Sequence, residues 1–292
     1  MKKLICLAVF LFCASFAMGA NLTIAVSLQP YANIVKSIGG SRVNVVALIP
    51  PSADPHTFEP KPATLKEFAK ADAYFSDGSG MDRAWLPRFL GANKNVKVFF
   101  LGNDVDWVMD RHHHHEAEAS HHEELDPHIW TSPKQVMKIA QNVRKVLSSI
   151  DSSGRDYYSQ RFSYFVNRIE KIDTRLARSA RRLPKNQKTF VVFHPSFGYL
   201  ANDYGLTQLS IEINGKEPKP KDLATVIVEA KKHNVHMVFV QPQFSKRSAE
   251  TIAKQLDAVV MTIDPLDADF VKTLNYFADA LDGVAKKKAS KK

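Results

Sequence analysis

Cysteine is nearly absent from this 292-residue chain, and the two that occur, Cys6 and Cys13, both lie in the first twenty residues. Those twenty residues begin with two lysines, continue with an apolar run over Leu4–Phe16 and end in the small residues Gly19 and Ala20. This pattern is typical of a secretory signal peptide that is cleaved after one of the last two positions. The exported part is therefore predicted to contain neither a thiol nor a disulfide, although an exported protein enters an oxidising compartment.

Lipid attachment is the alternative interpretation of Cys13. The bulky Phe12 stands directly before it, where a small residue is expected, and this argues against a lipid anchor. We therefore expect a soluble exported protein.

The chain also lacks a basic stripe interleaved with aromatic residues, the pattern that single-strand nucleic-acid binders use. Its formal net charge is +10, but seven of the lysines lie in two terminal segments, 1–20 and 285–292. We therefore predict no nucleic-acid partner and interpret the Lys-rich tail as a solvated end. Contact of this tail with an anionic membrane surface is the alternative.

Apolar, β-branched runs alternate with helix-like segments along the rest of the chain. Strands are predicted over 22–28, 43–49, 71–76, 96–101, 189–194, 207–211, 236–241 and 258–263. Helices are predicted near 30–39, 64–69, 133–150, 155–182, 196–204, 219–234, 246–256 and 268–284. Near-continuous apolar strands alternating with helices indicate parallel sheets covered on both faces. We expect an α/β protein of two lobes, each with a four-stranded, mostly parallel sheet flanked by helices.

One predicted helix, over 155–182, separates the first four strands from the last four. Its apolar residues form a single narrow seam, and a helix of this length reaches roughly 40 Å. It is interpreted as a rigid strut between the lobes, with a coiled-coil arm as the alternative. The expected organisation is a signal peptide over 1–20, a first lobe over 21–153, a linking helix over 154–183, a second lobe over 184–284 and a Lys-rich tail over 285–292.

A histidine-rich segment over 111–124 precedes the motif DPHIWTSP. It has no apolar periodicity and mixes histidines with glutamates, so it is predicted to be a solvated loop. We expect it to hold a metal weakly, and a passive insertion is the alternative. Its histidines are His112, His113, His114, His115, His121 and His122.

Four other side chains lie at or after the predicted carboxyl ends of strands, or in the approach between the lobes: His56, His128, His194 and Asp264. Ligands of open parallel sheets bind at that edge. Three imidazoles, with or without one carboxylate, suit a four-coordinate zinc ion. Three of these residues also have a structural interpretation: His56 as an ordinary loop residue, His194 as a core histidine and Asp264 as a turn cap. Candidates for contacts around the ligands are Glu59, Glu212 and Tyr199.

Four segments carry a resemblance to a known family: PPSADPHTFEPKP, DPHIWTSP, VVFHPSFGYLANDYG and MTIDPL. In this order and separation they resemble the signature segments of metal-binding proteins that feed ABC-type zinc and manganese importers. The acidic, histidine-rich insertion resembles the zinc-specific branch, and the likeness covers residues 21–284. It implies a monomeric periplasmic binding protein of two lobes that captures Zn²⁺ in the cleft between them and delivers it to an inner-membrane ABC permease.

The same resemblance places the metal ligands on His56, His128 and His194, with Asp264 at the fourth position. Manganese-selective relatives usually place a carboxylate where this chain has His194, and imidazole, the softer ligand, favours zinc. Manganese or iron uptake is the alternative within the family. Because neutral imidazoles bind the metal, capture is expected to weaken as the pH falls toward about 6.5.

Two other classes of function compete with metal capture. A zinc hydrolase would also use three histidines and a water. The sequence contains no H-E-x-x-H, no glycine-rich phosphate loop and no Gly-x-Ser-x-Gly, so the chain is predicted not to be an enzyme. A surface adhesin is the other alternative, and the soluble type of signal peptide argues against it.

Overall fold

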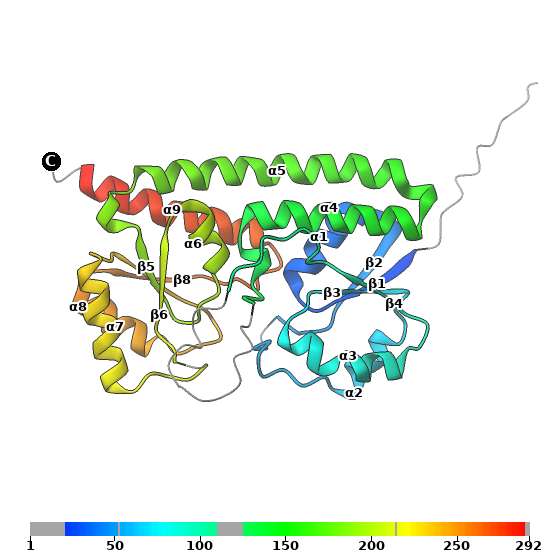
Figure 1. Ribbon diagram of the computed structural model, residues 1–292, viewed down its shortest axis with the longest axis horizontal. Helices are drawn as coiled ribbons and strands as arrows, with labels where there is room; N and C mark the ends of the chain where they lie inside the picture. The colour runs from blue at the N-terminus through cyan, green and yellow to red at the C-terminus, as the bar shows by residue number, and fades with distance from the viewer. Residues whose placement is uncertain (1–20, 52, 110–124, 214, 290–292) are drawn as a thin grey trace, which may run out of the picture.

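The computed structural model describes residues 21–51, 53–109, 125–213 and 215–289 (Figure 1). The predicted signal peptide, the six histidines of the predicted loop and the last three residues of the tail lie outside the described residues. Within the described ranges, no helix has the length and apolarity needed to cross a bilayer.

Two four-stranded parallel sheets form the framework, as predicted. The first has the strand order β2-β1-β3-β4 and the second the order β6-β5-β7-β8, with every pairing parallel. The strands of the first sheet are Leu22–Val26, Val43–Ala47, Ala73–Ser76 and Lys97–Phe100 for β1 to β4. Those of the second are Thr189–Val192, Thr207–Ser210, Met237–Val240 and Val259–Thr262 for β5 to β8. In each sheet the second strand along the chain lies on one side of the first strand, and the third and fourth strands lie on the other side. A crevice that binds ligands is expected where the strand order reverses in this way.

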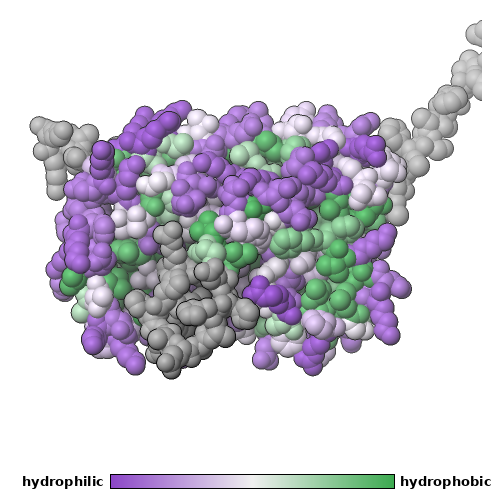
Figure 2. All heavy atoms as spheres, in the orientation of Figure 1, coloured by the Kyte–Doolittle hydropathy of each residue, from purple (hydrophilic) through white to green (hydrophobic). Residues whose placement is uncertain are grey.

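The central strands β3, β5 and β7 are buried throughout, because both faces of each sheet are covered. The edge strands β4 and β8 are largely exposed, with Val98 and Val259 open to solvent. Figure 2 shows apolar side chains gathered on the face of the molecule where Figure 1 labels β4, while the outer surface along α5 is hydrophilic.

Nine helices occur among the described residues: α1 Gln29–Gly39, α2 Pro62–Phe68, α3 Gly80–Ala92, α4 Pro133–Ile150, α5 Arg155–Arg182, α6 Gly198–Tyr204, α7 Pro220–Lys232, α8 Arg247–Leu256 and α9 Phe270–Ala289. All eight predicted helices are present. The predicted end of the last lobe at residue 284 falls inside α9, which continues to Ala289.

Helix α3 was not predicted. It contains Gly80, Pro87 and Gly91, residues that usually interrupt a helix, and it has no clear apolar stripe. Its first turn is instead held by Ser79, whose hydroxyl accepts a hydrogen bond from the backbone N–H of Asp82 at 3.2 Å. A local cap and tertiary packing therefore override a poor helical sequence.

Helix α5 has 28 residues and runs along both halves of the molecule (Figure 1). Its buried stripe includes Phe165, Ile169, Ile172 and Leu176. It packs against α1 and α4 of the first half and against α6 and α9 of the second. The prediction of a strut that joins two lobes is confirmed.

Direct hydrogen bonds also join the halves at the base of the region between them. Trp130 Nε1 donates to the carbonyl of Pro265 at 2.7 Å. The hydroxyl of Ser132 donates to the carboxylate of Asp203 at 2.5 Å. The main apolar core contains side chains from both sheets. The two halves are thus packed against each other along α5 and at this base.

Candidate metal centre

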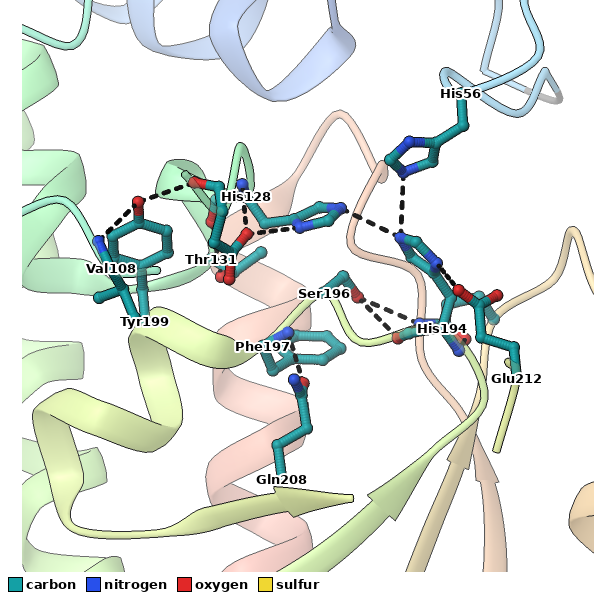
Figure 3. Close-up of polar contacts among 12 residues, drawn as sticks. His56, Val108, His128, Thr131, His194, Ser196, Phe197, Tyr199, Gln208 and Glu212 are labelled. Carbon is teal, nitrogen blue, oxygen red and sulfur yellow. Dashed lines mark hydrogen bonds and ion pairs between the residues drawn. The ribbon is translucent and has the colours of Figure 1, made fainter. Parts of the chain in front are cut away.

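Three histidines from three separate segments meet between the halves. His56 lies in the loop between β2 and α2, His128 precedes the short turn Ile129–Thr131 that leads into α4, and His194 follows β5. Nε2 of His194 lies 3.1 Å from Nε2 of His56 and 3.1 Å from Nε2 of His128. Figure 3 shows the rings of His56 and His128 approaching His194 from different parts of the chain.

The spacing of these nitrogens matches that of ligands around one small cation. One ligand atom from each of the three residues lies within 4.8 Å of the others. Tetrahedral zinc with Zn–N bonds of about 2.0–2.1 Å separates two ligand nitrogens by about 3.4 Å. The two 3.1 Å separations from Nε2 of His194 are close to that value.

Asp126 orients His128. Its Oδ1 lies 2.7 Å from Nδ1 of His128 and also accepts the backbone N–H of that residue at 2.9 Å. Nδ1 therefore carries the proton that it donates to the carboxylate, and the lone pair of Nε2 is directed at the other histidines.

The contact of the Asp126 carboxylate with His128 depends on Gly198 and Tyr199, which lie in α6. A Cβ atom added at Gly198 would lie 2.4 Å from the carboxylate oxygen of Asp126, so glycine leaves the room that this carboxylate occupies. The hydroxyl of Tyr199 donates to the backbone carbonyl of Asp126 at 2.7 Å and accepts the N–H of Val108 at 3.3 Å. Tyr199 thus holds the loop that carries Asp126 and does not touch the histidines itself.

Glu212 orients His194 in the same way. Its Oε1 lies 2.9 Å from Nδ1 of His194, and the glutamate is buried. Gln241, which follows β7, accepts the backbone N–H of His194 at 3.1 Å and donates to its carbonyl at 2.6 Å. The ring of Phe244 stacks on the imidazole at a centroid distance of 5.7 Å. These contacts hold the backbone of His194, its Nδ1 and one face of its ring.

His56 is held less firmly. Its backbone N–H donates to Asp54 Oδ1 at 3.0 Å, and the residue as a whole is exposed although its ring lines the cleft. Loss of hydration in the cleft, followed by repulsion from the imidazoles of His128 and His194, lowers the pKa of His56 to about 4. The ring is therefore neutral and able to bind a cation well below the expected pH of about 6.5.

Asp264 lies outside this group of three. Its Oδ1 accepts the backbone N–H of Leu266 at 2.9 Å and lies 3.4 Å from Nε2 of Gln243, as in a turn cap. Glu59 is exposed and is not among the described residues that line the cleft. The structure thus brings together His56, His128 and His194, with Glu212 behind His194 and Tyr199 behind Asp126.

Two residues that shape the site, Asp126 and Gln241, were not identified from the sequence. Asp126 stands two positions before His128 in the quoted motif DPH, and an aspartate at that distance is a common hydrogen-bond partner of the local backbone. Gln241 ends a predicted strand, where ligands bind in parallel sheets. These positions mark Asp126 and Gln241 as candidates for contacts near the ligands. The sequence does not indicate which side chain either of them would contact.

The cleft around the histidines has a volume of about 750 Å³. Both halves contribute to its walls, with apolar and polar side chains mixed. Lining residues include Ser79, Met81, Phe100, Trp107, Trp130, Ser196, Gln243 and Phe244.

Comparison with known proteins identifies the family. The model of the family "Zinc-uptake complex component A periplasmic", ZnuA, matches residues 24–284. The high-affinity zinc uptake system protein ZnuA of Bacillus subtilis is 28% identical over 260 residues, which cover 85% of this chain and 80% of that protein. The zinc-binding lipoprotein AdcA of Streptococcus pneumoniae strain R6 is 26% identical over 256 residues, 85% of this chain. The match spans about half the length of AdcA.

Comparison with solved structures indicates the same family. A crystal structure of ZnuA superimposes with a TM-score of 0.83 at 36% identity and covers 91% of this chain and 99% of that one. A ZnuA deletion mutant with zinc bound superimposes with a TM-score of 0.79, also at 36% identity, and covers 91% and 97% of the two chains. This chain belongs to the ZnuA family of periplasmic components of zinc-uptake complexes, a family of transport binding proteins and not of enzymes.

Proposed function

We propose that this chain captures Zn²⁺ in the cleft between its halves, with the Nε2 atoms of His56, His128 and His194 as ligands. The single observation that carries the proposal is the convergence of these three nitrogens, each from a different segment, at separations that suit one tetrahedral ion. The carboxylates of Asp126 and Glu212 support it, because each leaves a lone pair on Nε2.

Zinc is favoured over manganese or iron by the chemistry of the donors. Manganese prefers carboxylate, carbonyl and water oxygens, whereas imidazole nitrogen suits zinc. In this structure the three converging groups are all imidazoles. The zinc-bound ZnuA structure is a relative with the same fold.

The loaded chain would act as a monomer in the periplasm, after removal of residues 1–20, and would pass the ion to an inner-membrane ABC permease. Membership of a family of zinc-uptake components supports this proposal. The histidines within 111–124 would bind additional zinc weakly. Deletion of residues 111–124 tests that role, because an unchanged zinc stoichiometry would exclude the segment as a metal store.

Competitive metal binding on the purified protein tests the site. Wild type should bind one tightly held zinc ion that excess Mn²⁺ does not displace. His56→Ala and His194→Ala should each weaken binding by more than the roughly 10–100-fold that follows loss of an outer hydrogen-bond partner. His233→Ala is the matched control, because His233 is exposed on the end of α7 and pairs with Glu229. Equal affinity in all four proteins would overturn the proposal.

Oδ1 of Asp264 accepts the amide of Leu266, so Asp264 would join the three histidines either through its other oxygen or by leaving that amide. Asp264→Asn keeps an oxygen for that amide and removes the charge. A large loss of zinc affinity in this variant would make Asp264 the fourth ligand. Unchanged affinity would leave the fourth position to a donor from solution.

A further inference from the structure

A second cavity, of about 500 Å³, lies in the second half of the molecule. Residues that come before three of its strands line the cavity: Gln187 before β5, His236 before β7 and Asp257 before β8. The cavity is therefore at the amino ends of the second sheet, whereas His194 follows β5 at the carboxyl ends. The length of β5, four residues or about 13 Å, separates the two ends.

Apolar side chains of the sheet and of α9 form the walls of this cavity. Val259 and Met261 are two positions apart in β8 and so lie on one face of the sheet. Met237 of the neighbouring strand β7 is in register with Val259. The other wall is a stripe of α9 at helical spacing, formed by Tyr276, Ala280, Gly283 and Val284.

Two of these wall side chains are large, apolar and open to solvent. Val259 is 56% exposed and Tyr276 is 40% exposed. Val259 lies in the edge strand of the second sheet. A ligand in the cavity would remove this apolar surface from water, and 500 Å³ is within the usual range of roughly 300–1,000 Å³ for small-molecule sites.

The chemistry of the walls favours an aromatic ligand. Met237 and Met261 contribute thioethers, which form favourable contacts with aromatic rings, and Tyr276 provides a ring for offset stacking. The ligand need carry no charge to match Asp279 at the cavity, because Arg175 already pairs with that carboxylate.

One polar atom beside the cavity has no hydrogen-bond donor among the described residues. Oε1 of Gln187 is buried and accepts no hydrogen bond from them. A buried acceptor in this state costs free energy that a donor would recover. The last torsion of a glutamine side chain is broad, so a rotation of the amide would present Oε1 to a ligand in the cavity that Gln187 lines.

We infer that this cavity binds a small, uncharged aromatic molecule that carries one N–H or O–H donor, of the kind that indole represents. The ring lies between the two methionines and Tyr276, and its donor reaches Oε1 of Gln187. The inference goes beyond zinc capture and does not depend on it, because the two sites lie at opposite ends of the second sheet.

An indole titration of the purified protein with ¹³C-methyl-labelled methionine, followed by NMR, tests the inference. The methyl signals of Met237 and Met261 should shift and saturate, while that of Met137 in α4 stays in place. 1-Methylindole, which lacks the N–H, should bind about fivefold more weakly, the usual effect of losing one hydrogen bond. If the signal of Met81 in the metal cleft shifts instead, indole occupies that cleft and the inference fails.

Two variants locate the probe. Gly283→Leu should weaken indole binding about tenfold, because a Cβ at Gly283 meets nothing within 4 Å and the leucine would occupy part of the cavity. Gln187→Met keeps the length of the side chain and removes the acceptor, so it should bind indole and 1-methylindole equally. Gly91→Leu in α3 is the matched control for the glycine variant, since a Cβ there also meets nothing within 4 Å.

Zinc affinity, measured by competition with a chromophoric chelator, shows that each variant is folded and tests the proposed function separately. Equal indole affinity in Gly283→Leu and Gly91→Leu, or no saturable shift at Met237 and Met261, would overturn the inference whatever the zinc affinity. Equal affinity of the wild type for indole and 1-methylindole would overturn the stated class of ligand. Indole binding without zinc binding would uphold the inference and overturn the proposed function.

Discussion

At the scale of single residues, the site depends on which nitrogen of each imidazole carries a proton. The carboxylates of Asp126 and Glu212 accept from Nδ1 of His128 and His194, so Nε2 of both rings can bind a cation. Gly198 makes one of these contacts sterically feasible, because any side chain there would displace the carboxylate of Asp126.

Gly198→Ala should weaken zinc binding by about tenfold, the low end of the effect of losing an outer hydrogen-bond partner. The added methyl group would push Asp126 away from Nδ1 of His128. Zinc affinity is measured by competition titration. Gly91→Ala is the control, because a Cβ at Gly91 meets nothing within 4 Å. Equal affinity in the two variants would mean that the contact between Asp126 and His128 has no role in binding.

The protonation of His56 gives a second prediction. Its pKa is lowered to about 4, chiefly by loss of hydration in the cleft, while an unfolded chain has about 6.5. The unfolded state therefore binds more protons between these values, so this group makes the metal-free protein less stable as the pH falls from 6.5 to 4. NMR titration of the metal-free protein should place the His56 midpoint near 4. A midpoint near 6.5 would show that the ring is hydrated.

At the scale of elements, α5 connects the two halves through one apolar stripe. Leu176 lies on this stripe and is fully buried, and α5 packs on helices from both halves. Its length and its narrow seam follow from the sequence, but the partners of the seam do not.

Leu176→Ala should lower the free energy of unfolding by about 2–5 kcal/mol, because it leaves a cavity between α5 and the rest of the core. Chemical denaturation of the metal-free protein measures the change. Tyr164→Ala is the control on the same helix, since Tyr164 is 71% exposed and its loss should cost about 0.5 kcal/mol or less. Comparable losses in both variants would contradict the packing described for α5.

At the scale of the whole molecule, the halves are held together beside the cleft as well as along α5. Trp130 bonds Pro265, Ser132 bonds Asp203, and Tyr199 bonds Asp126, each across the two halves. These contacts, with a core that contains side chains of both sheets, leave little freedom for a wide hinge motion.

Zinc binding should therefore leave the radius of gyration unchanged within error in small-angle X-ray scattering. The rearrangement should be confined to the loop that carries His56, which is exposed and held by fewer contacts than His194. Hydrogen exchange should slow in residues 53–61 on addition of zinc and remain unchanged in α5. A contraction of the whole particle would instead indicate hinge closure.

The sequence by itself determined the alternation of strands and helices, the strut and the short list of metal-ligand candidates. These follow from apolar periodicity and from the rule that parallel sheets present ligands at their carboxyl ends. Helix α3 was not predicted because Gly80, Pro87 and Gly91 weaken the helical pattern of the sequence. In the structure a serine cap and packing stabilise the helix.

Only the tertiary structure decided which candidates meet. His56 and His128 lie 138 and 66 positions before His194 along the chain. The Nε2 atom of each comes within 3.1 Å of Nε2 of His194 because α5 and the bonds around α6 fix one half against the other. No local pattern encodes such contacts, because they depend on the relative placement of two separately formed sheets.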